Sequence, residues 1–218
     1  MSFDIAYKVK VLGMKYNNLE IELLKHDTVK IKSKNKVIYI DPIKIGNNAE
    51  KADIIICTHG HFDHCSRQDI LRLKKDETAI IGPSGVIKKL GEGHLIKVGQ
   101  KLNGSEIKIQ AVEAYNIGKK FHPKGLGIGI VIEIDGIKIY HAGDTDLIPE
   151  MKELAGKIDV AFLPVSGTYT MNAEEAAKAA EIIKPKVAIP MHYNAGIAGK
   201  EKDGEEFKKK YKGKAEIL

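Results

Sequence analysis

Cys57-Thr58-His59-Gly60-His61-Phe62-Asp63-His64-Cys65 is the stretch on which the interpretation of this sequence depends. It places three of the chain's 8 histidines and one aspartate within six positions. Imidazole nitrogens and carboxylate oxygens are ligands that Zn²⁺, Fe²⁺ and Mn²⁺ accept at neutral pH. Residues 53–57, which precede the cluster, form a short apolar run that is typical of a buried strand. The stretch therefore predicts a metal site where a strand ends.

Clustered histidines also occur in purification tags, weak surface chelators and structural zinc sites, but this stretch fits each of them less well. A purification tag would be terminal and repetitive, and a structural zinc site would usually contain cysteines paired at close spacing. This chain has only Cys57 and Cys65, one on each side of the histidines. A catalytic or substrate-facing metal centre is the favoured interpretation.

The composition suits a folded protein without a disulfide framework. We expect the 218 residues, 43% of them hydrophobic, to form one domain over residues 1–218. The first residues lack the pattern of a secretory signal, so a cytoplasmic location is expected. No apolar stretch approaches the roughly 18 residues that span a bilayer, so no membrane partner is expected.

The net charge of +6 raises the question of nucleic-acid binding. The lysines, however, are spread along the chain among 29 acidic residues. We therefore expect a small-molecule substrate, for which an anion is one option, and no nucleic acid. The sequence leaves open whether the chain forms homo-oligomers.

Hydrophobic periodicity predicts strand-rich segments that alternate with helix-containing ones. Strands are expected at residues 9–12, 19–24, 28–31, 37–40, 54–57, 78–81, 106–112, 127–134, 137–140, 160–163 and 187–189. Helices are expected at residues 67–74, 83–90, 147–154, 173–183 and 205–211. Asn172 and Glu175 predict a capped start for the helix at 173–183, and Asp135-Gly136 predicts a hairpin turn. Because a strand-rich stretch followed by a helix-containing one occurs twice along the chain, we predict a four-layer α/β/β/α sandwich.

Two further strand ends carry residues able to bind metal. Asp144 follows the apolar run at residues 137–140, and His192 follows the run at residues 187–189. Alone, such an aspartate is usually a turn or cap residue, and such a histidine is usually structural. With the first cluster present, both become candidate ligands.

These segments resemble the successive motifs of the metallo-β-lactamase superfamily. The resemblance rests on His59-Gly60-His61-Phe62-Asp63-His64, Ala142-Gly143-Asp144-Thr145 and Met191-His192-Tyr193, and it extends back to Tyr39-Ile40-Asp41-Pro42. It runs closest to the bacterial and archaeal metal-dependent hydrolases related to ascorbate-6-phosphate lactonase. The motifs are specific for the fold and the metal centre but not for the substrate.

The resemblance implies a dinuclear centre. His59 and His61 would hold one divalent cation, Asp63, His64 and His192 the second, and Asp144 would bridge the two. Zn²⁺ is the expected metal, with Mn²⁺ or Fe²⁺ as alternatives. Asp63 is also the expected catalytic carboxylate. Asp41 would orient a ligand imidazole, although an aspartate that simply ends a strand before a proline explains it equally well.

The chain departs from the family pattern at one ligand. The family usually places a third histidine on the first metal, and Asn116 stands where that histidine is expected. Asparagine is a poor zinc ligand, so His122 is the candidate substitute, either as a ligand or as a substrate contact. If neither binds, the centre would be effectively mononuclear.

The remaining polar residues have simpler interpretations. We expect His26 and His94 at the surface and His141 behind the site. Lys119, Lys120 and Lys124 form either an anion-binding rim or, with slight preference, a solvated loop. The hydroxyls of residues 166–170 serve the turn and helix cap or line the substrate mouth. Cys57 and Cys65 are expected to be small buried residues.

The predicted function is hydrolysis of an ester, lactone or phosphoester bond of a small substrate by a metal-bound hydroxide. Two alternatives stay open. One is a metal-dependent nuclease or RNA-processing enzyme, and the other is a non-catalytic module that holds metal for structure or sensing.

Overall fold

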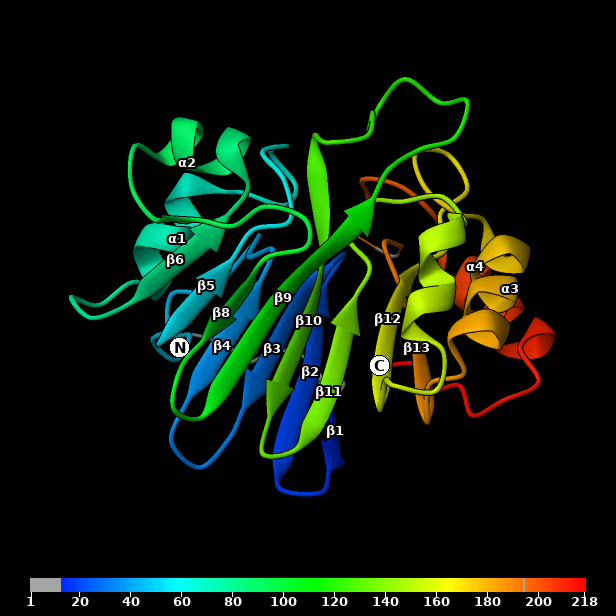
Figure 1. Cartoon of the computed structure of the whole chain (residues 1–218), viewed down its shortest axis with the longest axis horizontal. Helices are drawn as coiled ribbons and strands as arrows, with labels where there is room; N and C mark the ends of the chain where they lie inside the picture. Colours follow the sequence, from blue (N-terminus) through cyan, green and yellow to red (C-terminus); the bar gives the residue numbers. More distant parts are fainter. Residues whose placement is uncertain (1–12, 194) are drawn as a thin grey trace, which may run out of the picture.

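Two β-sheets pack face to face in the computed structural model, which describes residues 13–193 and 195–218, and helices lie at the two sides (Figure 1). The predicted four-layer α/β/β/α sandwich is therefore confirmed. The strand expected at residues 9–12 lies outside the described residues.

The first sheet holds seven strands in chain order. They are β1 (Gly13–Tyr16), β2 (Leu19–Lys25), β3 (Thr28–Lys32), β4 (Val37–Ile40), β5 (Ile54–Ile56), β6 (Ala79–Gly82) and β7 (His94–Leu95). The sequence patterns identified β2 to β6 to within one or two residues, whereas β1 and β7 were not predicted. Both missed strands are short edge strands with half-exposed or exposed residues, so they lack a buried apolar run.

The second sheet holds six strands in the order β13-β12-β11-β10-β9-β8. They are β8 (Lys101–Asn103), β9 (Ile107–Ala114), β10 (Gly127–Ile134), β11 (Ile137–His141), β12 (Val160–Pro164) and β13 (Val187–Met191). The Asp135-Gly136 turn joins β10 to β11, and both residues have the positive φ that such a two-residue hairpin needs. Only the three-residue β8 was not predicted.

Strand direction brings many chain segments to one edge of the sandwich. In the first sheet, β2 and β4 are each antiparallel to β3, and β4 is parallel to β5, so β2, β4 and β5 point the same way. In the second sheet, β9, β11, β12 and β13 likewise share one direction. The residues that follow each set of strands are therefore gathered at a common sheet edge.

The helices cover part of the outer face of each sheet. α1 (Arg67–Leu73) and α2 (Ser84–Leu90) lie beside β5 and β6, whereas α3 (Ala173–Ile183) and α4 (Glu201–Lys210) lie beside β12 and β13 (Figure 1). The helix predicted at residues 147–154 is instead a 3₁₀ helix, η1 (Pro149–Leu154), and Pro149 marks its start. The helix predicted at residues 205–211 begins four residues earlier, at Glu201.

The main hydrophobic core lies between the two sheets. Ile38 and Ile40 of the first sheet and Ile130, Ile132 and Ile139 of the second are all fully buried there. A second, smaller cluster, which includes Tyr39, Ile55, Ile70, Leu73 and Val86, packs α1 and α2 onto the outer face of the first sheet. The strands around the sheet edge are thus anchored from both faces.

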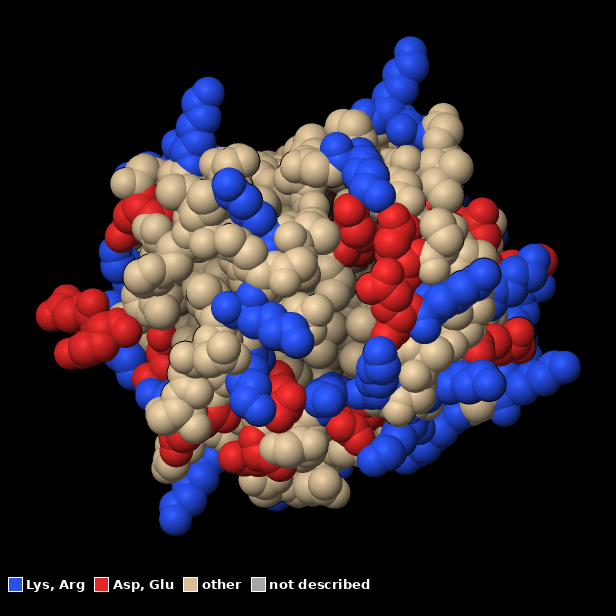
Figure 2. Space-filling model, viewed as in Figure 1, with Lys and Arg blue, Asp and Glu red and all other residues tan. Residues whose placement is uncertain are grey.

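Basic side chains are spread over the face shown in Figure 2 and acidic ones gather right of centre, so no charge of one sign covers the face. This distribution agrees with the scattered lysines of the sequence. Among the described residues, no helix is long and apolar enough to cross a membrane.

The capping box at α3 offers a direct test of the local sequence pattern. Asn172 accepts a hydrogen bond from the Glu175 N–H, and the Glu175 carboxylate accepts one from the Asn172 N–H, both at 2.9 Å. We expect Asn172→Ala to lower the free energy of unfolding by about 1 kcal/mol, measured by denaturant titration. Asn172→Asp keeps the acceptor and should stay within about 0.5 kcal/mol of the wild type. Equal losses in both variants would contradict the role of the cap.

Candidate metal centre

Three histidines from two chain segments form the first group of donor atoms. His59 and His61 follow β5, and His122 lies in the loop between β9 and β10. Nδ1 of His61 lies 3.0 Å from Nε2 of His59 and 3.2 Å from Nε2 of His122. The structure thus brings His122 to the position proposed for the substitute ligand.

Asn116 contacts His122 through its side-chain oxygen and does not itself direct a metal-ligand atom into this group. Its Oδ1 accepts the backbone N–H of His122 at 3.0 Å and lies 3.1 Å from Nδ1 of the same ring. Its amide nitrogen donates to the carbonyl of Tyr169 at 2.9 Å. With Nδ1–H donating to Asn116, the lone pair of Nε2 is free to bind a cation.

Asp144 lies between the two groups of histidines. Its Oδ2 is 3.1 Å from Nε2 of His122 and 3.2 Å from Nε2 of His192, and its Oδ1 is 3.4 Å from Nε2 of His64. Gly143 has φ +63°, and a Cβ there would lie 2.8 Å from the carbonyl oxygen of Ile128. The chain can therefore turn so closely before Asp144 only at a glycine.

His64 and His192 present Nε2 to the second group, and each has its other nitrogen held. Nδ1–H of His64 donates to Asp41 Oδ2 at 2.7 Å. Nδ1 of His192 lies 2.9 Å from Oγ of Ser166, which in turn lies 3.0 Å from Oγ1 of Thr170. Asp41 therefore orients a histidine as expected, and Ser166 has a positioning contact that the sequence patterns did not identify.

Asp63 lies farther from this group than expected. Its Oδ2 is 3.9 Å from Nε2 of His64 and 3.4 Å from Nε2 of His26, and its side chain is 12% exposed. Asp63 is not among the three sets of donor atoms that cluster within 4.8 Å of one another. It therefore lies at the more open side of the centre.

His26 and Asp27 were missed as site residues, and the expectation that His26 lies at the surface is wrong. His26 is 2% exposed and Asp27 is fully buried. Both lie in the turn that follows β2, at the same sheet edge as the residues after β4 and β5. A short polar turn is usually solvated, so the sequence favoured the surface. The shared direction of β2, β4 and β5 is the signal that places this turn at the site.

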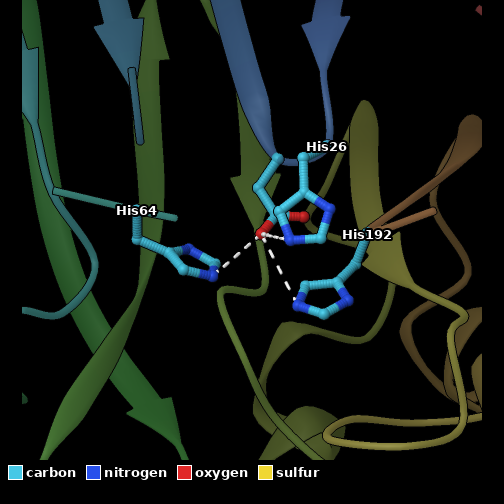
Figure 3. Close-up of side chains that lie close together, drawn as sticks. His26, His64 and His192 are labelled. Atoms are coloured by element: carbon cyan, nitrogen blue, oxygen red, sulfur yellow. Dashed lines mark ion pairs between the residues drawn. The ribbon is translucent and has the colours of Figure 1, made fainter. Parts of the chain in front are cut away.

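The rings of His26, His64 and His192 converge from three chain segments onto one carboxylate oxygen (Figure 3). That atom is Oδ2 of Asp27, which lies 3.1 Å from His64 Nε2, 3.7 Å from His26 Nε2 and 3.9 Å from His192 Nε2. The backbone N–H of His192 also donates to the carbonyl of His26 at 3.0 Å. The turn after β2 is thus joined to the end of β13.

The simpler interpretations of His141, His94 and the two cysteines are confirmed. His141 is fully buried, and its Nε2 lies 2.9 Å from the carbonyl oxygen of Asp27, behind the site. His94 is exposed, and Cys57 and Cys65 are buried.

Two of the three lysines in the loop between β9 and β10 have carboxylate partners, whereas Lys120 is exposed without an ion pair among the described residues. Lys119 pairs with Asp146 at 2.6 Å, and Lys124 pairs with Glu150 at 2.8 Å and Glu113 at 3.3 Å. The ammonium groups of Lys119 and Lys124 are therefore both paired with carboxylates of the same chain.

Burial and neighbouring charges shift the pKa values of His59 and His192, one from each group, in opposite directions. Burial lowers the pKa of His59 well below its usual value, and the charge of His64 adds to that effect. Burial also disfavours a charged His192, but Asp144 and Asp27 outweigh it and raise the pKa of His192 to about 9. A cation entering the second group must therefore displace a proton from His192.

The donor atoms fit a metal centre because they face one another and three of them make no hydrogen bond within the described part of the chain. Nε2 of His64, Nε2 of His192 and Oδ1 of Asp144 are buried without a hydrogen bond among the described residues. Ligands at tetrahedral positions about 2.0–2.1 Å from a zinc ion lie roughly 3.3 Å apart. The separations of 3.0–3.4 Å around Asp144 and His61 match that spacing.

A separate hollow of about 560 Å³ lies on the outer side of β9, β10 and β11. Its lining includes Lys101, Lys108, Tyr140 and Glu150, and none of the candidate ligands. This hollow is therefore separate from the candidate metal centre.

One protein-family model, described as a β-lactamase superfamily domain, matches residues 20–192 of this chain. A UPF0173 metal-dependent hydrolase of Thermococcus onnurineus is 37% identical over 92% of this chain and 95% of its own length. A similarly named protein of Geobacillus is 36% identical over 78% of this chain and 83% of its own length.

Solved structures show the same likeness. The crystal structure of a protein from Parabacteroides distasonis, whose name includes metal-dependent hydrolase, superimposes with a TM-score of 0.88. It is 36% identical in sequence, and the match covers 95% of this chain and 98% of that one. Igni18, a metallo hydrolase of Ignicoccus hospitalis, shares the fold, with a TM-score of 0.75 at 23% identity over 92% of this chain and 94% of its own.

Asn116 should control metal affinity through His122. We expect Asn116→Ala to weaken binding of one cation by about 10- to 100-fold, because the ring of His122 loses the acceptor that sets its orientation. Competition between the protein and a chelator for Zn²⁺ measures this change. Asn116→Asp retains the acceptor oxygen and should bind more tightly than Asn116→Ala. Unchanged affinity in Asn116→Ala would show that His122 needs no such support.

Removal of metal should destabilise the protein, since the buried donor atoms then lose their partner. A ligand present at about 1,000 times its Kd stabilises the folded state by about 4 kcal/mol, and each kcal/mol shifts Tm by about 2–4 °C in a chain of this size. We expect EDTA to lower Tm by several degrees and added Zn²⁺ to restore it, measured by calorimetry. An identical Tm with and without EDTA, at confirmed metal contents, would contradict this expectation.

Proposed function

Because the chain belongs to the metallo-β-lactamase superfamily and is a metal-dependent hydrolase, we propose that it cleaves an ester, lactone or phosphoester bond of a small substrate. The proposal includes two divalent cations, with Zn²⁺ the first expectation and Mn²⁺ or Fe²⁺ the alternatives. The observation that carries it is the position of Asp144, whose two oxygens face both groups of histidines.

The donors of the first group suit a hydrolytic site. His59, His61 and His122 supply three nitrogens and Asp144 a shared oxygen to the first cation, so a water molecule or a substrate oxygen would bind there as a fifth ligand. Cations held there supply an acidified water and polarise the bond that is cleaved. The chain then needs no nucleophilic side chain.

The chain's own residues hold the reacting groups in place. Asn116, Asp41 and Thr58 contact the outer nitrogens of ligand rings, so these rings enter the reaction already oriented.

Asp63 is more open than the other carboxylates of the centre and is suited to proton transfer. Burial by itself would raise the pKa of Asp63, but the pairing with His26 and the charge of His64 outweigh burial and hold that pKa below its usual value. Asp63 is therefore ionised at neutral pH and can accept a proton from the attacking water.

Exposed aromatic side chains adjoin the centre and suit a substrate with an apolar part. Phe62, between His61 and Asp63, is 73% exposed, and Phe121, next to His122, is 49% exposed. The ring of Phe121 meets that of Tyr169 edge to face at 4.7 Å. Large exposed apolar side chains beside polar ones are typical of ligand-binding surfaces.

The test compares hydrolysis of a panel of esters, lactones and phosphodiesters by the wild type and by Asp144→Asn. We expect wild-type turnover that EDTA abolishes, and a loss of about 100-fold or more in kcat/KM for Asp144→Asn, since charge stabilisation by the cations is worth several kcal/mol. Glu133→Gln, which removes a surface carboxylate paired with Lys108, is the matched control and should keep wild-type activity.

The same panel separates the alternatives. Metal-dependent cleavage of oligonucleotides with salt-sensitive binding, and no turnover of small substrates, would favour a nuclease and overturn the small-substrate proposal. Metal-loaded protein that hydrolyses nothing across the panel would oppose the proposed reaction and favour a non-catalytic metal-binding module.

A further inference from the structure

We propose that His26 and Asp27 are ligands of the second cation, in a four-donor site completed by His64 and His192. This inference rests on the proposed function, because it concerns one of the two cations proposed there. It assigns a metal-binding role to the turn after β2, which the sequence patterns placed at the surface.

The side chains of this turn lack hydrogen-bond partners. Both ring nitrogens of His26 and both oxygens of Asp27 are buried without a hydrogen bond among residues 13–193 and 195–218. The same holds for Nε2 of His64 and of His192. A buried carboxylate without hydrogen bonds is costly unless it is paired or coordinates a metal. One cation would give a partner to Nε2 of His26, His64 and His192 and to Oδ2 of Asp27.

The four donor atoms also have the spacing of a single site. They lie within 4.8 Å of one another, and each belongs to a buried residue. Oδ2 of Asp27 is 3.1–3.9 Å from the three Nε2 atoms, close to the roughly 3.3 Å expected between tetrahedral zinc ligands. Three imidazoles and one carboxylate form a donor set that zinc and similar divalent cations accept.

The turn is held in place by contacts that leave these donors free. The carbonyl of His26 accepts the N–H of His192, and the carbonyl of Asp27 lies 2.9 Å from Nε2 of His141. Oγ1 of Thr28 donates to the carbonyl of Asp41 at 2.7 Å. His26 and His192 also both have positive φ, a conformation that non-glycine residues keep only where surrounding contacts require it.

With Asp27 as a ligand, Asp63 keeps the catalytic role expected of it but not the ligand role. Oδ2 of Asp27 lies 3.1 Å from Nε2 of His64, whereas Oδ2 of Asp63 lies 3.9 Å from it. Asp27 therefore takes the place in the ligand set that Asp63 was expected to fill. Asp63, which is partly exposed, is left to face the substrate.

The test measures metal binding rather than turnover. Wild type, Asp27→Asn and Asp63→Asn are freed of metal with a chelator, reloaded with Zn²⁺ alone and examined by mass spectrometry for ions per chain and by chelator competition for affinity. We expect two ions in the wild type. Asp27→Asn should lose one of them or bind it at least about 100-fold more weakly, while Asp63→Asn should keep both within a few-fold of the wild-type affinities.

His26→Gln is the second variant, and it should also weaken one of the two ions. It keeps the inference testable if Asp27→Asn fails to fold, because the asparagine variant removes a charge from a fully buried position. His61→Ala provides the converse, since it should weaken the other ion and leave this site loaded.

The outcomes separate this inference from the proposed function. Wild-type stoichiometry and affinities in both Asp27→Asn and His26→Gln, together with loss of an ion in Asp63→Asn, would overturn the inference and leave the metal-dependent hydrolase intact. Wild-type protein that binds no Zn²⁺ would overturn both.

Discussion

The hydrogen bonds accepted by Asp41 hold the edge of the sandwich on which the centre depends. One carboxylate oxygen accepts the N–H of Thr58 at 2.7 Å, and the other accepts the Oγ1–H of Thr58 at 2.6 Å and Nδ1–H of His64 at 2.7 Å. The Asp41 backbone N–H also donates to Ile56, and its carbonyl accepts Oγ1–H of Thr28. The Asp41 carboxylate therefore joins the ends of β4 and β5 to the candidate ligand His64, and the Asp41 carbonyl adds a contact to the start of β3.

This arrangement repeats at other candidate ligands with different residues. Asn116 holds His122, Ser166 contacts His192, and Thr58 contacts His59. In each case an oxygen meets the outer nitrogen of the ring, so Nε2 points to the centre. The second sheet contributes two of these supports and the first sheet one. Correct packing of the two sheets is therefore required before the donor atoms can meet.

The two sides of the centre differ in solvent exposure. His61 and Asp63 are partly open to solvent, whereas His26, Asp27, His64 and His192 are buried. In the dinuclear proposal, the open side is where a substrate can approach, and the buried side is suited to a cation held for charge and position. The exposed ring of Phe62 lies between the two partly open residues in the chain, which agrees with that division.

Local patterns in the sequence were sufficient for most of the fold and for part of the site. The strands β2 to β6 and β9 to β13 stand out as apolar, β-branched runs, and the Asn172 cap marks the start of α3. The His59–His64 cluster predicts metal binding because its residues are neighbours in the chain. Edge strands such as β1 and β8 gave no such signal, since few of their residues are buried.

The tertiary structure alone decided which distant residues reach the centre. His26 and Asp27 occupy a short polar turn, and only the direction of β2 relative to β4 and β5 places that turn beside His64. Asn116 and His122 could not be ranked from sequence, because their roles depend on which side-chain atoms face each other across a loop. The sequence by itself determined that this chain carries a metal-binding cluster at a strand end. The donors that complete it were decided by the packing of two sheets, because coordination depends on distances between atoms that are far apart along the chain.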